Sequence, residues 1–291
     1  MNILLLGHRG WIGSMMAELL EKEGIGYFTT DIRPQNKQKF EAFIIKTKPS
    51  HIMSFIGRTH GKIDQTEYTT IDYLEQPGKI QDNIRDNLFS PLVVALLAQK
   101  YQIHYTYLGT GCIFKFDESH PAGDEKTGFL ESDTPNFTGS SYSIVKGYTD
   151  ELLHLLENQV LNLRIRMPII GKHHPRNFIT KITKYEHIWS IPNSMTVLSE
   201  LLPYVIQMAQ NKITGTINLT NPGLISHNQI LEMYREYVDP EFTWKNFSQE
   251  EQRQILAADR SNNCLDTERL ESLFPDVNPI QESMRQLFQN W

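Results

Sequence analysis

The chain of 291 residues is long enough to bury one large hydrophobic core or two smaller ones. Its hydrophobic content of 40% is ordinary for a soluble globular protein, and no stretch approaches the roughly 18 apolar residues that a membrane helix needs. The formal net charge of −6 argues against a nucleic-acid partner that binds through phosphate neutralisation.

The cysteine content indicates the cellular compartment. The sequence has two cysteines, Cys112 and Cys264, which provide no disulfide framework. We therefore expect a reducing, cytoplasmic environment. The apolar run that ends at Leu6 is too short for a signal peptide and is typical of a first buried strand.

The first half of the chain alternates short apolar runs with amphipathic stretches. We expect strands at 2–6, 27–30, 51–56, 103–108 and 161–165. The helical spacing of apolar residues predicts helices at 12–23, 37–47, 88–98 and 141–157. This alternation predicts an α/β fold, with a Rossmann-like doubly wound parallel sheet.

Prolines interrupt the pattern after Pro168, where a smaller and more irregular C-terminal part begins. A strand is expected at 215–219, and helices are expected at 196–210, 225–237 and 280–289. Ser226 or His227 could cap the second of these helices.

The same patterns predict two functional parts. Residues 1–166, with a returning strand and helix at about 192–219, form the expected dinucleotide-binding domain. Residues 167–191 and 220–291 form the expected substrate-binding part, and a cleft between the two would hold substrate.

A glycine-rich turn follows the first strand and opens the first helix. Glycine at positions 7, 10 and 13 would let the backbone approach a pyrophosphate, whose charge a helix N-terminus favours. A plain strand-to-helix turn can have the same spacing, but the location after the first strand favours a cofactor site. The residues expected to contact this cofactor are Gly7, Arg9, Gly10, Trp11, Ile12 and Gly13, and Gly57 at the end of the third strand.

The choice of cofactor depends on the end of the second strand. Asp31 would bind a ribose 2′-hydroxyl and favour NADH, whereas Arg33, or Arg9 in the glycine turn, would favour the 2′-phosphate of NADPH. The sequence favours NADPH and leaves NADH open.

Tyr142 and Lys146 are one helical turn apart on the same face of a predicted helix. An ammonium beside a phenol favours the phenolate, which makes Tyr142 a candidate proton donor near neutral pH. Thr110, at the end of the fourth strand, could donate to a substrate carbonyl. Together with the glycine turn, these residues indicate hydride transfer between a nicotinamide and a carbonyl.

Other side chains have two interpretations. Cys112 could be a small buried hydrophobe or an acid–base group, and Lys181 is by default a solvated helix lysine. The adjacent His173 and His174 point in different directions, so no metal is predicted. Aromatic side chains that could stack on a nucleoside, but are more often core, are Phe114, Phe116 and Phe137.

The whole pattern resembles the extended branch of the short-chain dehydrogenase/reductase superfamily. Within it, the chain is most similar to plant-type nucleotide-rhamnose synthases, which act as 3,5-epimerase and 4-reductase on UDP-4-keto-6-deoxyglucose. Bacterial dTDP-4-dehydrorhamnose reductases are similar at greater distance. The resemblance covers nearly the whole chain and rests on the motifs at 7–13, 110–114, 136–142, 164–168, 175–181, 191–196, 221–227 and 260–263.

The resemblance implies roles for particular residues. Thr110, Tyr142 and Lys146 would reduce the 4-keto group. Tyr142 and Lys146 would also contact the cofactor, with Lys146 at the nicotinamide ribose. Cys112 and Lys181 would carry the epimerase activity in an order that the sequence leaves open. The residues implied to bind the sugar or its diphosphate are Arg176, Asn177, Phe178, Arg260 and Asn263.

Two other functions remain open at this point: a reductase without epimerase activity, and a non-catalytic NADP-binding regulatory subunit. The segment Ser54–Gly57 and the region of Asp31 depart from the family pattern near the cofactor. A homodimer is compatible with the sequence, and no membrane partner is expected.

Overall fold

The computed structural model describes residues 1–248, 251 and 261–291, which form two compact units. The first unit contains Met1–Thr110, Ser140–Leu163 and Pro203–Ile217. The second contains Gly111–Gly139, Arg164–Leu202 and Asn218–Trp291. The chain changes unit near the predicted boundary at Arg166, whereas the segment 111–139 belongs to the second unit and not to the first.

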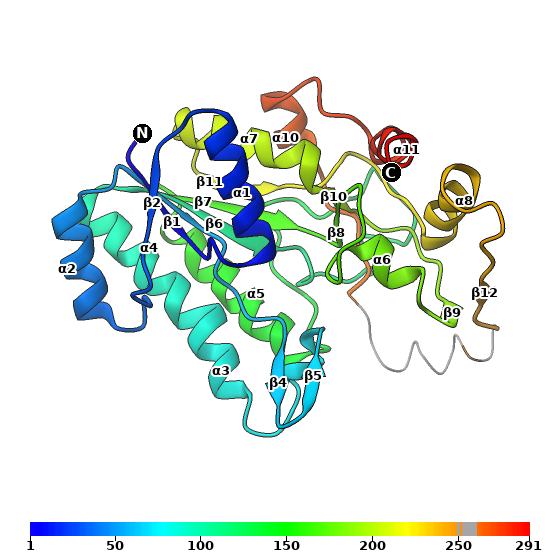
Figure 1. Cartoon of the computed structure of the whole chain (residues 1–291), viewed down its shortest axis with the longest axis horizontal. Helices are drawn as coiled ribbons and strands as arrows, with labels where there is room; N and C mark the ends of the chain where they lie inside the picture. The colour runs from blue at the N-terminus through cyan, green and yellow to red at the C-terminus, as the bar shows by residue number, and fades with distance from the viewer. Residues whose placement is uncertain (249–250, 252–260) are drawn as a thin grey trace. The chain divides into compact units, whose positions relative to one another are not determined.

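A six-stranded sheet forms the centre of the first unit (Figure 1). The strands, in sheet order, are β11 (Gly215–Asn218), β7 (Val160–Ile165), β6 (His104–Thr110), β3 (His51–Ser54), β1 (Ile3–Leu6) and β2 (Tyr27–Thr29). β1 pairs in parallel with β2 and β3, and β3 pairs in parallel with β6. The predicted Rossmann-like parallel sheet is therefore confirmed.

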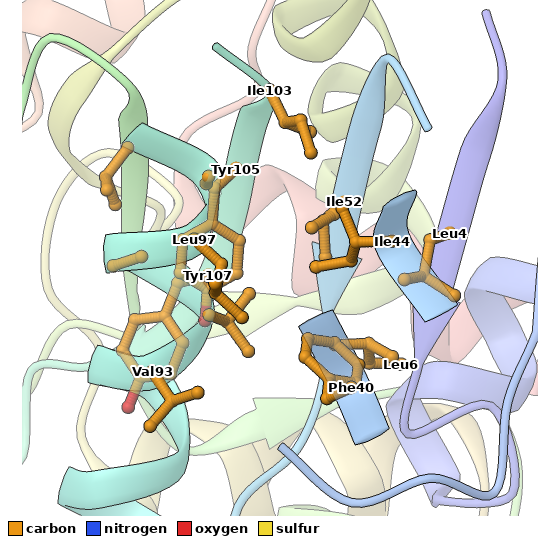
Figure 2. Packing of buried hydrophobic residues seen from close by; sticks show 14 of the residues in the cluster. Leu4, Leu6, Phe40, Ile44, Ile52, Val93, Leu97, Ile103, Tyr105 and Tyr107 are labelled. Carbon is orange, nitrogen blue, oxygen red and sulfur yellow. The ribbon is translucent and has the colours of Figure 1, made fainter. Parts of the chain in front are cut away.

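Helices cover both faces of this sheet. Side chains of α2 (Lys37–Thr47), α4 (Ser90–Tyr101) and α5 (Ser141–His154) share one hydrophobic core with β1, β3 and β6 (Figure 2). The other face is covered by α1 (Trp11–Lys22) and α7 (Leu198–Gln210) (Figure 1). Each fully buried Leu or Ile in such a core contributes about 1.5–3 kcal/mol, so this face anchors the strand ends that carry the site.

The helical segment that contains the predicted helix at 88–98 begins earlier than expected, at Ile80. It consists of α3 (Ile80–Ile84), a π-helical turn, η2 (Arg85–Phe89), and then α4. Pro91 has no N–H to donate to the Asn87 carbonyl, and the Thr149 hydroxyl of α5 donates to it instead at 2.7 Å. The sequence does not reveal this early start, because the polar side chains of 80–87 face other polar groups rather than a hydrophobic core.

A short hairpin also lies where the sequence predicts no element. It consists of β4 (Gly61–Ile63) and β5 (Thr66–Tyr68), and the 3₁₀ turn η1 (Ile71–Tyr73) follows. The Tyr73 ring packs against Gly61, where a Cβ would come within 2.5 Å of the ring. Strands of three residues are too short to produce a period-two signal in the sequence.

The second unit is built from short elements around its own core. Its parallel strand pairs are β8 (Pro168–Ile169) with β10 (Thr196–Val197) and β9 (His187–Ile188) with β12 (Lys245–Asn246). Its helices are α6 (Phe178–Ile182), α8 (His227–Tyr237), α10 (Glu268–Leu273) and α11 (Ile280–Gln289). Ser226, not His227, caps α8 through a capping box with Gln229.

The predicted helix at 196–210 needs a correction, because its first two residues form β10 and the helix begins at Leu198. Across residues 1–248 and 261–291, no helix combines the length and the apolar character needed to cross a bilayer.

Two histidines are buried side by side in the sheet of the first unit. His51 and His104 are partners in the β3–β6 register, with ring centroids 5.4 Å apart. The Nε2 atom of His51 lies 3.1 Å from the Ala209 carbonyl, and that of His104 lies 2.7 Å from the Ile213 carbonyl. Burial lowers the pKa of His51 to about 4, with the neighbouring His104 adding to the effect, and burial also lowers the pKa of His104.

These shifts predict a loss of stability in mild acid. Because the pKa of His51 is lower in the folded than in the unfolded state, its contribution is complete above about pH 6.5 and is lost as the pH falls toward about 4. We expect the free energy of unfolding in urea to be roughly 1–3 kcal/mol lower at about pH 5 than at about pH 7.5.

The variant His51→Gln should flatten this pH dependence, whereas His173→Gln, at an exposed histidine, should leave it unchanged. Equal slopes for the wild-type protein and His51→Gln would contradict the assignment.

Candidate active site

The turn after β1 requires glycine at two positions. A Cβ at Gly13 would lie 2.1 Å from the Gly7 carbonyl oxygen, and a Cβ at Gly7 would lie 2.8 Å from the Phe55 carbonyl carbon. Gly7 also has a φ of +79°, which favours glycine. The Gly10 N–H donates to the Gly7 carbonyl at 2.8 Å, and α1 begins with Trp11. The turn therefore brings the positive end of α1 close to the end of β1.

A cavity of about 400 Å³ adjoins this turn and is lined by some of the predicted cofactor residues, whereas its lining does not include Gly10, Trp11, Ile12, Gly13, Tyr142 or Lys146. Arg9 and Asp31 form an ion pair of 2.9 Å at its rim, and both side chains are about three-quarters exposed. The lining of the cavity includes Gly7, Arg9, Asp31, Arg33, Gly57 and Arg58. The three guanidinium groups of the lining outnumber its two carboxylates, those of Asp31 and Asp86, so the cavity suits a phosphate.

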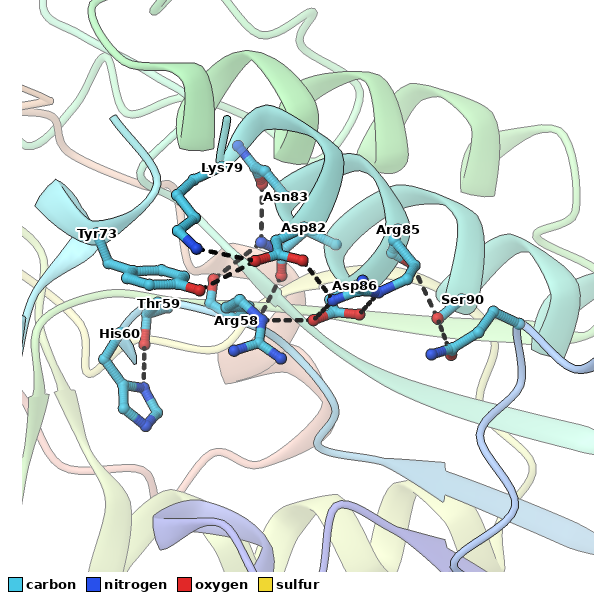
Figure 3. A network of polar contacts seen from close by, with 12 residues as sticks. Arg58, Thr59, His60, Tyr73, Lys79, Asp82, Asn83, Arg85, Asp86 and Ser90 are labelled. Atoms are coloured by element: carbon cyan, nitrogen blue, oxygen red, sulfur yellow. Dashed lines mark hydrogen bonds and ion pairs between the residues drawn. The ribbon is translucent and has the colours of Figure 1, made fainter. Parts of the chain in front are cut away.

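A polar network that the sequence does not reveal holds the loop after β3 (Figure 3). The Arg58 guanidinium lies 2.5 Å from the Asp86 carboxylate, and the Arg58 backbone exchanges two hydrogen bonds of 2.8 Å with the Asn87 amide. Burial acts to raise the pKa of Asp86, but Arg85 and Arg58 hold it below its usual value. The network thereby secures Gly57 at the edge of the cavity.

The helix α5 carries Tyr142 and Lys146, whose side chains are buried, with exposed fractions of 9% and 4%. The start of this helix is capped twice. The Ser140 hydroxyl accepts from the Ser143 N–H at 3.0 Å, and the Glu75 carboxylate accepts from the N–H of Ser141, also at 3.0 Å. These caps hold the first turn of α5, and with it the Tyr142 backbone.

Tyr107 of β6 is a further residue of this site that the sequence reasoning missed. The Lys146 ammonium donates to the Tyr107 hydroxyl and lies 4.5 Å from the ring centroid. Burial raises the pKa of Tyr107 well above its usual value, and the phenols of Tyr105 and Tyr142 act in the same direction. Tyr107 therefore stays neutral and can accept from Lys146. The strand also ends in Thr110, which is buried, so β6 supplies two groups to this region.

Cys112 belongs to the second unit and is partly exposed. The Asn263 amide holds the loop around it, because its Nδ2 donates to the carbonyls of Gly111 and Phe114, each at 2.9 Å. Asn263 is itself completely buried. The amide of Asn263 therefore holds the Cys112 loop, and direct contact of Asn263 with substrate stays a prediction.

Lys181 lies on α6 of the same unit. Burial lowers its pKa, and Arg176 adds to this effect. Asn177 is completely buried as the N-cap of α6, and its Nδ2 donates to the Ile170 and Lys172 carbonyls at 2.9 and 2.8 Å. Its amide thus positions α6 rather than facing solvent. Phe178 follows at the start of the helix, and Arg260 lies outside the described residues.

Two weaker candidates have other roles. The Phe114 ring is buried and stacks on Phe129 at a centroid distance of 4.5 Å, and Phe137 is also buried, so both belong to a core rather than to a stacking wall. The His173 ring packs edge-on against Trp291 at 5.3 Å. Within the part of the chain that the structure describes, no three His, Cys, Asp or Glu residues converge on a metal position.

Comparison with known proteins identifies the family. Residues 3–185 match the model described as the NAD dependent epimerase/dehydratase family. The chain belongs to this family. This membership confirms the predicted resemblance to extended short-chain dehydrogenases/reductases.

Similar proteins narrow the resemblance further. The chain is 54% identical over 287 residues to protein L780 of Acanthamoeba polyphaga mimivirus, covering 99% of this chain and 97% of that one. The crystal structure of the L780 UDP-rhamnose synthase superposes on this chain with a TM-score of 0.93 and 52% identity. The match covers 100% of this chain and 99% of that one.

A bifunctional dTDP-4-dehydrorhamnose 3,5-epimerase/reductase of Arabidopsis thaliana is 46% identical over 97% of this chain and 91% of its own length. A dTDP-4-dehydrorhamnose reductase of Bacillus anthracis, in complex with NADP, shares the fold with a TM-score of 0.76. That structure is 18% identical and covers 99% of this chain and 97% of that one. The predicted similarity to plant-type nucleotide-rhamnose synthases is thus confirmed.

The close contact within the glycine turn predicts that cofactor binding is sensitive to substitution of Gly13. In Gly13→Ala the new methyl group would push against the Gly7 carbonyl, and overpacking of this kind costs about 1–3 kcal/mol. We expect the Kd for the nicotinamide dinucleotide, measured by calorimetric titration, to rise about tenfold or more.

The matched control is Gly26→Ala, because a Cβ at Gly26 meets no atom within 4 Å. Equal affinities for the two variants would show that the turn does not hold the dinucleotide.

Proposed function

We propose that the protein is a bifunctional 3,5-epimerase and NADPH-dependent 4-reductase that converts UDP-4-keto-6-deoxy-D-glucose to UDP-L-rhamnose. The observation that carries this proposal is the coexistence of two residue sets in one chain. Thr110, Tyr142 and Lys146 suit ketone reduction, and Cys112 with Lys181 suits proton exchange at carbon. The similarity to the L780 UDP-rhamnose synthase supports the same conclusion.

The first unit suits a dinucleotide. The close approach at Gly13 leaves a cradle that only glycine permits, and the adjoining cavity has the volume and the guanidinium groups for a nucleoside phosphate. Gly7, Gly10 and the first turn of α1 would hold the pyrophosphate, and Arg9 and Arg33 would hold a 2′-phosphate. NADPH, when bound, supplies the hydride.

The preference for NADPH follows from the Arg9–Asp31 pair. An acid at the end of β2 would favour the 2′-hydroxyl of NADH, but the Asp31 carboxylate is shared with Arg9. The Bacillus anthracis reductase, whose structure contains NADP, has the same fold. We therefore propose NADPH as the preferred cofactor and NADH as a poorer substitute.

Reduction requires a proton at O4 of the sugar. Tyr142 donates this proton, and Lys146 stabilises the phenolate that remains. Tyr107 accepts a hydrogen bond from Lys146 and thereby orients the ammonium. Thr110 donates to the sugar ketone and, with Tyr142, stabilises negative charge on its oxygen.

Epimerisation uses the acidity that the C4 ketone gives to C3 and C5. One group removes each proton, leaving an enolate, and an acid returns a proton to the opposite face. Cys112 and Lys181 carry these steps, and the lowered pKa of Lys181 makes its ammonium a stronger acid than that of an exposed lysine. Thr110 and Tyr142 would stabilise the enolate oxygen as well.

The nucleotide-sugar is bound by residues of the second unit. Arg176, whose pKa burial lowers, is the direct candidate for the diphosphate, together with Phe178 and Arg260. Asn177 and Asn263 act through the backbone that they hold. The UDP form is proposed because the similar L780 protein is a UDP-rhamnose synthase.

The proposal predicts a specific product and label. Incubation with UDP-4-keto-6-deoxyglucose and NADPH in deuterated buffer should give UDP-L-rhamnose labelled at C3 and C5, detected by NMR. Turnover with NADPH should exceed that with NADH. Tyr142→Phe should slow NADPH oxidation by about 10²–10⁴-fold because the general acid is lost.

Variants separate the two activities. Tyr148→Phe is the matched control for Tyr142→Phe, since Tyr148 lies on the same helix with 64% exposure. Cys112→Ser should suppress the deuterium label. Product without label would identify a reductase that lacks epimerase activity, and an absence of NADPH oxidation by the wild-type protein would favour a non-catalytic subunit.

We also propose that the protein forms a homodimer through helices of the first unit. α4 and α5 pack together, and both expose apolar side chains. An apolar surface of this kind is typical of a two-fold interface between identical chains. The exposed residues are Ile80, Ile84, Phe89 and Leu96 on α3, η2 and α4, and Ile144, Tyr148, Leu152 and Leu155 on or next to α5.

Light scattering after size exclusion tests the dimer. The wild-type protein should have twice the mass of the chain, and Leu155→Glu, at a side chain with 78% exposure, should shift it toward the monomer. Leu273→Glu, at an exposed leucine of α10, is the control and should remain dimeric. A monomeric wild-type protein would overturn the proposal.

A further inference from the structure

Arg166 is a buried guanidinium in the second unit that no step proposed above uses. It follows β7 directly and has an exposed fraction of 1%. Its Nη2 donates to the Asn193 side chain and to the Ser261 carbonyl, each at 2.7 Å. Its Nη1 donates to the Ser261 hydroxyl at 3.1 Å and to the Gly111 carbonyl at 3.2 Å. These acceptors are all neutral.

The charge of Arg166 therefore lacks the usual partner. Buried guanidinium groups are normally paired with a carboxylate, but no carboxylate is among its partners in residues 1–248 and 261–291. Burial lowers the pKa of Arg166, and the thiols of Cys112 and Cys264 act in the opposite direction. A guanidinium stays protonated at physiological pH, so the positive charge persists.

Among residues 1–248, 251 and 261–291, three titratable groups face this charge, and only one of them can become its counter-ion. Cys264 has an exposed fraction of 3%, and burial raises its pKa to about 11. Burial lowers the pKa of His227, which can supply no negative charge. Cys112 is partly exposed, and its Sγ lies 3.9 Å from Nη1 of Arg166.

We propose that Arg166 is a positioning residue that stabilises the thiolate of Cys112. The inference rests on the proposed epimerase function, in which a thiolate can take a proton from the sugar carbon. The C–H bond breaks, an S–H bond forms, and the electron pair moves into the enolate. Reactive cysteines occur in partly exposed, electropositive surroundings, and the guanidinium supplies them here.

The alternative is that Arg166 only ties together the backbone around Gly111, Ser194 and Ser261. A structural tie and an electrostatic partner make different predictions for the pH dependence of Cys112 reactivity. Loss of a structural tie would change the reactivity equally at all pH values. Loss of the charge would slow the reaction at neutral pH, and the difference would vanish in alkali, where thiols ionise without help.

The test is alkylation of Cys112 by iodoacetamide, followed by mass spectrometry. At about pH 7 we expect the wild-type protein to react about tenfold or more faster than Arg166→Met, and at about pH 10 the rates should converge. Arg166→Lys keeps a positive charge and should recover part of the rate. Equal rates for the wild-type protein and Arg166→Met at about pH 7, or a ratio independent of pH, would overturn the proposal.

A matched control is Arg164→Met. Arg164 is also completely buried, two residues earlier, but its guanidinium lies 5.0 Å from the Phe114 ring centroid and donates to the Leu130 carbonyl. This variant should retain the wild-type alkylation rate. If Arg166→Met does not fold, native wild-type protein is compared with the urea-unfolded chain at about pH 7, and a native Cys112 that reacts no faster would also overturn the proposal.

The alkylation requires no substrate, so it is independent of the proposed function. Absence of deuterium at C3 and C5 with the wild-type protein would remove the epimerase assignment and leave the effect of Arg166 on the thiol intact. Normal labelling with no effect of Arg166 on alkylation would remove only the role of Arg166.

Discussion

The contact between Gly13 and the Gly7 carbonyl is the constraint on which the first unit depends. It brings the start of α1 against the end of β1 and leaves no space for a side chain on Gly13, and the Phe55 backbone leaves none on Gly7. The same turn borders the cavity in which Arg9 meets Asp31. The end of β1 and the guanidinium-bearing residues Arg9, Arg33 and Arg58 therefore border one cavity that suits a nucleoside phosphate.

The two sets of candidate catalytic residues are supported by different physics. Around Tyr142 and Lys146 the support is a capped helix and a strand phenol, so orientation comes from hydrogen bonds to α5 and β6. Around Cys112 the support comes from the buried guanidinium of Arg166 and from the amide of Asn263, which donates a hydrogen bond to the loop within the second unit. Reduction and epimerisation make correspondingly different demands, for a directed proton donor and for an ionised thiol.

Much of the fold followed from apolar spacing, and the helices 37–47 and 280–289 have the predicted bounds. The glycine turn and the Tyr142–Lys146 spacing were also readable because they are local. Arg58 with Asp86 and Arg166 with Cys112 were not, since 28 and 54 residues separate the partners. Nothing in a periodic pattern indicates which distant polar side chains meet in a folded chain.

The order of segments along the chain has a consequence for the gene. Each compact unit is assembled from three separate stretches, and the first change of unit falls between Thr110 and Gly111, just before Cys112. No single contiguous segment of the gene therefore encodes either unit completely. The segments that carry the two sets of candidate catalytic residues are therefore interleaved along one polypeptide.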